Sequence, residues 1–201
     1  KVHNAQSSFF GTNPVCFAAP MAKEDPFILD MATSLVSWNK IKNYRIANEP
    51  IPEGWAYDEN GNFVTDPHAA KSLRPTGDYK GFGLGMMVDV LCAVLTGGII
   101  SKDLLPMFTS PAEAQRKVSH FFMVMDISKF TELQSFKENL QTMADRIRQL
   151  EKLNEDEVMV AGDPEKKQAA IREKEGIPIS EIVWKEYLEI NSEFQKCVIQ
   201  K

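Results

Sequence analysis

The segment from Arg74 to Gly98, RPTGDYKGFGLGMMVDVLCAVLTGG, constrains this 201-residue chain more than any other. A turn-rich approach leads into a predicted helix over residues 81–95 that has almost no polar face. A helix that is apolar all round is typically buried, and one of about 15 residues is too short to cross a membrane. The pattern therefore predicts a buried central helix.

The entrance of this helix carries Gly81, Gly83 and Gly85 at alternate positions, with Lys80 immediately before them. Glycine permits close backbone approach, so Gly83 and Gly85 are expected to face close neighbours. The free N–H groups and the positive dipole end of a helix favour an anion such as phosphate. The sequence thus indicates an anion site at Lys80, while the alternative of tight helix packing without any ligand stays open.

This entrance does not match the dinucleotide fingerprint of Rossmann folds. Gly81 to Gly85 spell GxGxG rather than GxGxxG, although Asp103 lies at the distance expected of an acidic ribose ligand. The fingerprint also requires a strand directly before its first glycine, and residues 74–78 form a predicted turn instead. A Rossmann site is therefore excluded.

A second candidate site is the segment Asp30, Met31, Ala32, Thr33 and Ser34. A strand over residues 27–29 is expected to pass directly into a helix from Met31 to about Ala47, with Asp30 as its N-cap. A helix start rich in hydroxyl groups can hold phosphate or ribose. A plain capped helix without a ligand is the alternative.

The remaining pattern predicts an α/β protein in which a mixed sheet is flanked by helices. Buried strands are expected at 15–19, 120–126 and 157–160, with hairpins joining 15–19 to 27–29 and 55–57 to 63–65. Residues 101–115 are expected to be irregular. Period-3.6 hydrophobicity from Thr131 predicts a long amphipathic helix, and further helices are expected up to Glu175 and after Ser180. We expect a cofactor-binding core over residues 1–130 and a helical segment over 131–201, with a cofactor loop near 157–165.

Charge and cysteine content narrow the function classes. The net charge is −5, and no basic patch with interleaved aromatics suggests nucleic-acid binding. No apolar run is long enough for a membrane span, and no signal peptide is evident. Cys16, Cys92 and Cys197 have no metal-ligand or disulfide spacing, and the first two are expected to be buried thiols in a cytoplasmic protein. The chain lacks an initiator methionine, as a fragment or a processed chain would.

The residues themselves resemble a known family. GTNPVCFAAP at residues 11–20 is similar to the GTNP…FAAP segment of the malate/L-lactate dehydrogenases, and LDMATS at 29–34 and KGFGL at 80–84 continue the resemblance. Further matches follow in order along nearly the whole chain, at 52–55, 65–67, 89–91, 95–97, 120–122, 162–165 and 175–177. Each segment alone is weak, but the ordered set is specific.

The resemblance implies a non-Rossmann α/β fold, usually homodimeric, that transfers a hydride between NAD, or NADP, and a 2-hydroxy acid or its 2-oxo acid. It implies that Asp30–Ser34 contact the dinucleotide and that Tyr79 and Lys80 form a second cofactor segment. Gly162, Asp163 and Pro164 fall on a third cofactor segment, where Ala161 replaces the usual proline.

The family's catalytic histidine and substrate-binding arginine belong to a region upstream of Lys1. His3, His68 and His120 do not lie in that motif, so the 201 residues alone are expected to bind NAD(H) weakly or not at all and to turn over neither malate nor lactate. Malate or lactate is the leading substrate expectation, with ureidoglycolate the main rival. A non-catalytic cofactor-binding or dimerisation fragment is the alternative from a different functional class.

Overall fold

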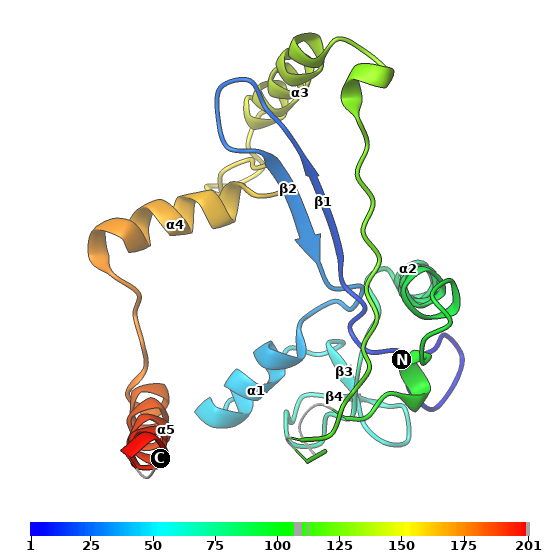
Figure 1. Ribbon diagram of the computed structural model, residues 1–201, viewed down its shortest axis with the longest axis vertical. Helices are drawn as coiled ribbons and strands as arrows, with labels where there is room; N and C mark the ends of the chain where they lie inside the picture. Colours follow the sequence, from blue (N-terminus) through cyan, green and yellow to red (C-terminus); the bar gives the residue numbers. More distant parts are fainter. Residues whose placement is uncertain (107–109, 112, 200–201) are drawn as a thin grey trace.

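The structure, a computed structural model, describes residues 1–106, 110–111 and 113–199, and the side chains up to residue 192 except at those gaps. It is a mixed α/β chain with two small antiparallel sheets (Figure 1). The strands are β1 (Val15–Ala19), β2 (Phe27–Met31), β3 (Ala56–Tyr57), β4 (Phe63–Val64) and β5 (Ser72–Leu73). The helices are α1 (Trp38–Ala47), α2 (Tyr79–Asp89), the π-helix η1 (Val90–Val94), the 3-10 helices η2 (Ser101–Asp103) and η3 (Ile127–Lys129), α3 (Leu133–Arg148), α4 (Asp163–Glu175) and α5 (Glu181–Ile199).

The first hairpin was predicted and is present: β1 pairs antiparallel with β2, from Val15 opposite Met31 to Ala19 opposite Phe27. It connects the two parts of the chain that carry the candidate site. Its turn lies beside α3 and α4, and its other end leads to α1, α2 and the second sheet (Figure 1). The expected burial of β1 is wrong, because Cys16 and Phe17 are exposed. Cys92 is half-buried, and the Cys197 side chain lies outside the described residues.

The hydrophobic core lies between α1 and the second sheet, whose strand order is β4-β3-β5. The hairpin of β3 and β4 was predicted, whereas β5, which adds a third strand, was not. Ile41 of α1 is fully buried and Ile51 nearly so. The buried cluster is completed by Ala56, Ala70 and Leu73. These residues come from α1, β3, β5 and the segments that connect α1 to β3 and β4 to β5, so the core holds the whole 36–73 region together.

Helix α1 begins seven residues later than predicted. Asp30 and Met31 are the last residues of β2 rather than an N-cap and a first helical turn. The cap is Ser37, whose side chain accepts a hydrogen bond from the Lys40 backbone N–H at 3.2 Å. The Ser34 hydroxyl donates to the Val36 carbonyl two residues further on, and such local bonds compete with helix formation. The Thr33 hydroxyl donates to the distant Thr12 carbonyl.

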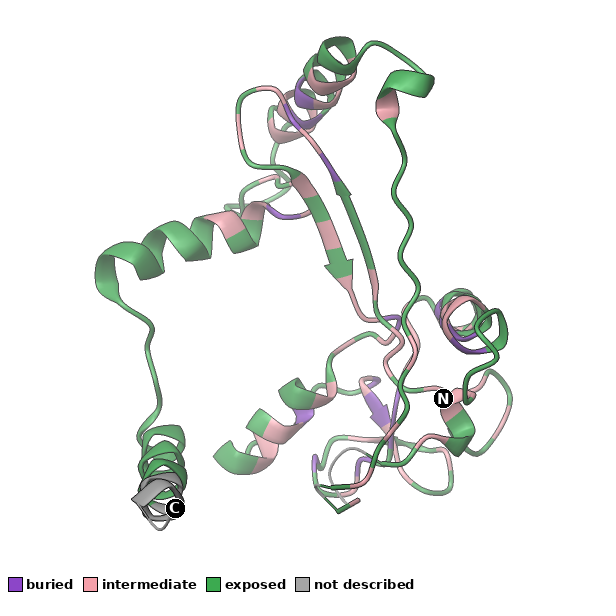
Figure 2. Cartoon of the chain, in the orientation of Figure 1, coloured by how far each residue is buried: buried purple, intermediate pink, exposed green. Residues whose placement is uncertain are grey.

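The prediction that the central helix is buried all round is wrong. One face is buried, and it consists of residues four apart: Gly81, Gly85, Asp89 and Ala93. The other face is open, with Met86 50% and Val94 62% exposed (Figure 2). A uniformly apolar pattern has no amphipathic signal, so only the small residues mark the packed face of this helix.

Two predicted strands are absent from the described residues. Residues 120–126 are extended but pair with no described strand, and Phe122 is 87% and Val124 95% exposed. Residues 157–160 are irregular, because the Val160 N–H bonds to the Asp163 carboxylate instead of a neighbouring strand. The expected irregular stretch 101–115 contains η2 and partly lies outside the described residues.

The C-terminal helices match their predictions. Helix α3 follows the period-3.6 pattern, and α4 ends at Glu175 before Gly176, which has a φ of 85°. The Ser180 hydroxyl accepts a hydrogen bond from the Val183 N–H at the start of α5. None of the helices in the described part of the chain is apolar enough over a sufficient length to cross a membrane.

Candidate functional site

The structure brings the first two predicted cofactor segments together through their backbones. The Thr76 N–H donates to the Thr33 carbonyl at 3.0 Å, and the Leu35 N–H donates to the Arg74 carbonyl at 2.7 Å. Ser34 and Pro75 form an isolated antiparallel bridge between these bonds. The chain leaving β2 therefore runs beside the turn that opens α2.

Thr33 connects this junction to a third strip of chain. Its N–H and its hydroxyl both donate to the Thr12 carbonyl, at 2.9 and 3.0 Å, and its side chain is buried. The Ser34 hydroxyl donates to the Val36 carbonyl at 2.7 Å. The Asn13 amide donates to the Gly85 carbonyl at 2.8 Å, so residues 11–14 contact α2 as well. Residues far apart in sequence are thus held in one place by backbone and side-chain hydrogen bonds.

Two glycines of α2 permit this close approach. A Cβ at Gly81 would overlap the Thr76 carbonyl oxygen and would lie 2.6 Å from the Thr76 nitrogen and 2.9 Å from the Thr33 oxygen. A Cβ at Gly85 would lie 3.2 Å from the Thr33 hydroxyl. At Gly83 it would meet no described heavy atom within 4 Å, so the prediction of close neighbours is confirmed for Gly85 and wrong for Gly83.

A cavity of about 560 Å³ opens at this junction. Its wall carries hydroxyl groups of Thr12, Thr33, Ser34 and Ser37, and the ring of Trp38. Gly81 and Gly85 form part of the same wall, and Lys71 and Lys1 supply positive charge. None of the described lining residues is an aspartate or a glutamate. The wall therefore suits a ligand with anionic and hydroxyl groups beside flat rings, as a dinucleotide has.

Tyr79 and Lys80 stand at the N-terminal end of α2. Tyr79 lines a second cavity of about 580 Å³ together with His3, Tyr57 and Asp78. Its ring is 60% exposed and lies edge-on to the His3 ring at 6.0 Å. The Lys80 ammonium is 6.0 Å from the centre of the Tyr79 ring. Asp78 accepts two hydrogen bonds from Arg74, at 2.7 and 2.8 Å, so the negative charge of its carboxylate is balanced by the Arg74 guanidinium.

The third predicted segment, Gly162 to Pro164, packs against the β1-β2 hairpin away from both cavities and lines neither of them. Gly162 has a φ of 93°, and a Cβ there would lie 3.1 Å from the oxygen and 3.3 Å from the nitrogen of Ile28. Ile28 is two residues before Asp30 in β2. Asp163 and Pro164 form the first turn of α4 rather than a loop.

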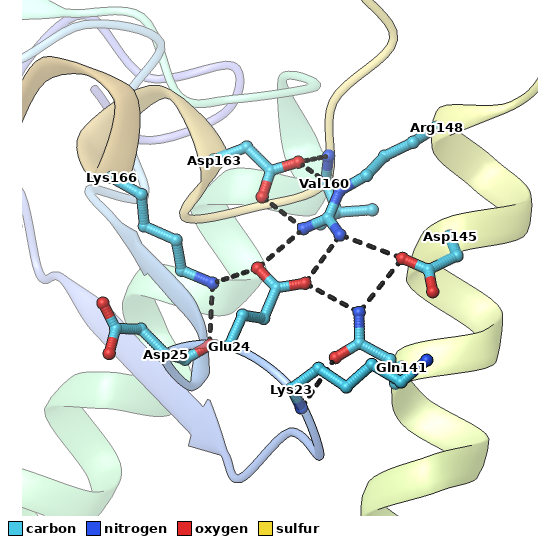
Figure 3. Close-up of polar contacts among 9 residues, drawn as sticks. All are labelled: Lys23, Glu24, Asp25, Gln141, Asp145, Arg148, Val160, Asp163 and Lys166. Carbon is cyan, nitrogen blue, oxygen red and sulfur yellow. Dashed lines mark hydrogen bonds and ion pairs between the residues drawn. The ribbon is translucent and has the colours of Figure 1, made fainter. Parts of the chain in front are cut away.

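A network of charged side chains holds this third segment (Figure 3). The Arg148 guanidinium donates two hydrogen bonds to Asp163, at 2.8 and 2.6 Å, and two to Glu24, at 2.7 and 3.2 Å. Lys166 donates to Glu24 at 2.9 Å, and Gln141 donates to Glu24 at 2.9 Å and Asp145 at 3.0 Å. The hairpin turn, the end of α3 and the start of α4 are joined in this way.

This network was not predicted from the sequence, although two of its residues carry a local signal. Arg148 lies in the last turn of α3 and Asp163 in the first turn of α4, where their charges complement the two helix dipoles. Glu24, in the turn of the β1-β2 hairpin, had no local pattern that linked it to either helix. Only the tertiary structure brings the three together.

The network sets the ionisation of its carboxylates. Hydrogen bonds from Arg148 lower the pKa of Glu24 from 4.5 to about 2, against the opposing effect of desolvation. Hydrogen bonding to Arg148 also holds the pKa of Asp163 below its ordinary value of 3.8. Both carboxylates are therefore charged at neutral pH in the folded protein.

The lowered pKa of Glu24 predicts how stability changes with pH. A carboxyl whose pKa falls on folding stabilises the folded state above its unfolded pKa, and this contribution is lost as the pH falls through the folded pKa. The contribution of Glu24 should thus be complete above about pH 4.5 and lost progressively towards pH 2. Thermal unfolding of the parent and Glu24→Gln should give melting temperatures that differ at pH 7 and converge across this window. A difference independent of pH would contradict the assignment.

The other ionisable candidates form no further site. His68 lies in an exposed turn and His120 in the exposed extended segment. Within the described ranges, no group of three histidine, cysteine, aspartate or glutamate side chains is placed to hold a metal ion.

Comparison with known proteins shows the family of the chain. Residues 1–187 match the malate/L-lactate dehydrogenase family. Malate dehydrogenase from Pyrococcus horikoshii is 39% identical over 191 residues, which are 90% of this chain and 52% of that protein. A solved structure of malate dehydrogenase from the same organism aligns with a TM-score of 0.82 and 32% identity, covering 96% of this chain and 54% of that one.

Relatives with other names are similarly close. Ureidoglycolate dehydrogenase (NAD(+)) from Escherichia coli O157:H7 is 38% identical, over 67% of this chain and 39% of that protein. A (2R)-3-sulfolactate dehydrogenase (NADP(+)) from Chromohalobacter salexigens is 40% identical, over 61% of this chain and 37% of that protein. The chain spans about half the length, or less, of the relatives it matches. By its family match and by these identities, the chain belongs to the malate/L-lactate dehydrogenase family.

Proposed function

We propose that this chain is the main cofactor-binding part of a protein that transfers a hydride between NAD or NADP and a 2-hydroxy acid. The observation that carries the proposal is the junction of residues 33–35 with residues 74–76, which brings Thr33, Ser34 and Gly81 to one cavity. Lys80 precedes Gly81 in the sequence and lines neither cavity. Family membership supports the reaction class. The bound nicotinamide would accept or supply the hydride.

The residues present fit a dinucleotide in charge and in shape. Hydroxyl groups of Thr33 and Ser34 and the cation of Lys71 line the cavity, and the missing side chain of Gly81 leaves the α2 backbone in direct contact with the junction. In our proposal, the N–H groups at the start of α2 and the Lys80 ammonium attract the phosphates. Our proposal also includes Asp30, Met31 and Ala32, at the end of β2 and just after it, on the strength of their match to the family, although none of the three lines either cavity. Tyr79 is the sequence neighbour of Lys80.

The proton of the substrate hydroxyl needs an acceptor, and general-base catalysis contributes about 10²–10⁴-fold. None of the three histidines is among the described residues that line the first cavity. We therefore propose that the proton acceptor and the cation that orients the substrate carboxylate come from another part of the complete protein.

Malate or lactate is the proposed substrate, because a malate dehydrogenase is 39% identical to this chain over 90% of its length. Ureidoglycolate is the second candidate, favoured by the ureidoglycolate dehydrogenase that is 38% identical to this chain. With the complete protein, oxidation of NADH and NADPH in the presence of oxaloacetate or pyruvate, and reduction of NAD and NADP with ureidoglycolate, would decide between them. Failure with every one of these substrates would contradict both assignments.

Lys80→Ala tests the cofactor site directly. Loss of a charge-assisted hydrogen bond costs about 1.5–3 kcal/mol. Binding of NADH or NADPH, followed by nucleotide fluorescence, should weaken roughly tenfold to more than a hundredfold. Lys129→Ala, which removes an equally charged side chain from η3, is the control and should leave the affinity unchanged. An unaltered dissociation constant for Lys80→Ala would remove Lys80 from the site.

A further inference from the structure

The charged network around Arg148 is built to fix a position rather than to bind a ligand. Arg148 uses its Nε, Nη1 and Nη2 groups on Asp163 and Glu24, at 2.6 to 3.2 Å. The side chains of Arg148 and Glu24 are about a quarter exposed and that of Asp163 only 15%. Two-pronged contacts between a guanidinium and carboxylates constrain orientation as well as distance.

Asp163 transmits this constraint to the backbone of the third cofactor segment. Its carboxylate also accepts a hydrogen bond from the Val160 N–H at 3.0 Å, so both ends of the turn around Gly162 are held. Lys166, one turn further along α4, bonds to the Glu24 carboxylate at 2.9 Å and to the Asp25 carbonyl at 2.7 Å. Helix α4 is thus attached to the hairpin at two points.

The fixed turn meets the hairpin next to the first cofactor segment. Gly162 packs so closely on the backbone of Ile28 that a Cβ at this position would be crowded. Asp30 follows Ile28 two residues later in β2. Any loosening of Arg148 would therefore change the separation between Gly162 and the end of β2. The Asp163 carboxylate itself is fully engaged by Arg148 and Val160 and points into the network (Figure 3).

We infer that Arg148 is a positioning residue for the dinucleotide: it acts through Asp163 to hold the 162–164 turn at the distance from residues 30–34 that the bound cofactor requires. This inference rests on the proposed function. It assigns Asp163 an indirect role, in which the turn offers its backbone to the cofactor while the carboxylate holds the turn in place.

A double-mutant cycle in the purified protein tests the indirect role. Arg148→Met and Asp163→Asn should each weaken NADH or NADPH binding roughly tenfold to a hundredfold, the scale of a misplacement of about 1 Å. The double variant should bind no more weakly than the weaker single variant, because both changes break one connection. In the complete protein at saturating cofactor, kcat should remain close to that of the parent while the KM for cofactor rises.

The control is Lys167→Ala, which removes the ion pair of Lys167 with Glu157 from the same helix, where both side chains are more than half exposed. It should not change affinity. If Arg148→Met fails to fold, Arg148→Lys keeps the charge but not the two-pronged geometry and should still raise the KM. Additive losses in the cycle, or an unchanged KM in Arg148→Lys and Arg148→Met, would overturn the inference.

The outcome is separable from that of the proposed function. Weaker binding in Lys80→Ala together with unchanged binding in the Arg148 variants would reject the positioning role and leave the cofactor site intact. A complete protein that binds neither NADH nor NADPH would reject both.

Discussion

Substituting alanine for Gly81 should destabilise the protein by about 3 kcal/mol, the upper end of the usual range for an overpacked interior. The added Cβ would overlap the carbonyl oxygen of Thr76 and would lie 2.9 Å from that of Thr33. These atoms belong to backbone segments that are hydrogen-bonded to each other, so they cannot move aside independently. Chemical denaturation would measure the loss.

Gly83→Ala is the matched control, two residues along the same helix. No described heavy atom lies within 4 Å of the position of its Cβ. Alanine in a helix interior is favoured over glycine by about 0.5–1 kcal/mol, so this variant should be slightly more stable than the parent. Opposite signs for the two variants are therefore expected. Equal effects would show that the packed face of α2 is not the one described.

The same pair of variants separates stability from binding. Gly81→Ala should also weaken binding of NADH or NADPH, because it pushes apart the two segments that line the cavity. Gly83→Ala should bind as the parent does. Cofactor affinity measured at a temperature where both variants are folded would distinguish a displaced site from a merely less stable protein.

Ile41→Ala should cost about 2–5 kcal/mol, the range for truncating a fully buried aliphatic side chain. Ile41 has no exposed surface and packs in the cluster formed by α1, Ile51 and the β3-β5 sheet. Its neighbours come from three different segments that are held by the sheet, so the cavity left by the truncation can collapse only partly.

Ile46→Ala, on the same helix, is the comparison. The Ile46 side chain is 53% exposed, and changes at such surface positions usually stay within about 0.5 kcal/mol. Urea denaturation of both variants should show a clear shift of the midpoint only for Ile41→Ala. Equal midpoints would place the core elsewhere.

The sequence alone determined the elements whose signals are local. The 3.6-residue period of α3, the glycine after α4 and the serine before α5 depend on neighbouring residues, and the structure has these helices where they were predicted. The hairpin of β1 and β2 is bounded by prolines and was also correctly predicted. The family and its fold class were evident from ordered motifs, since these are properties of residue identity.

Local signals failed where hydrogen bonds between distant segments decide the conformation. The helix expected from Met31 begins only at Trp38, because the Thr33 and Leu35 N–H groups bond to residues 12 and 74 instead of forming local helical hydrogen bonds. Residues 120–126 have the composition of a buried strand. A strand needs a partner, however, and the described chain supplies none to this segment.

Burial and the candidate site were decided by the tertiary structure. The apolar residues of α2 indicated burial on every side, yet the buried residues of this helix are Gly81, Gly85 and Asp89 on one face. In the sequence, Thr33 and Lys80 belong to two separate motifs that were predicted to bind one cofactor. In the structure, backbone hydrogen bonds between residues 33–35 and 74–76 bring the two segments together. The connection from Glu24 through Arg148 to Asp163 spans 139 residues, and no periodicity can encode the meeting of side chains so far apart in sequence.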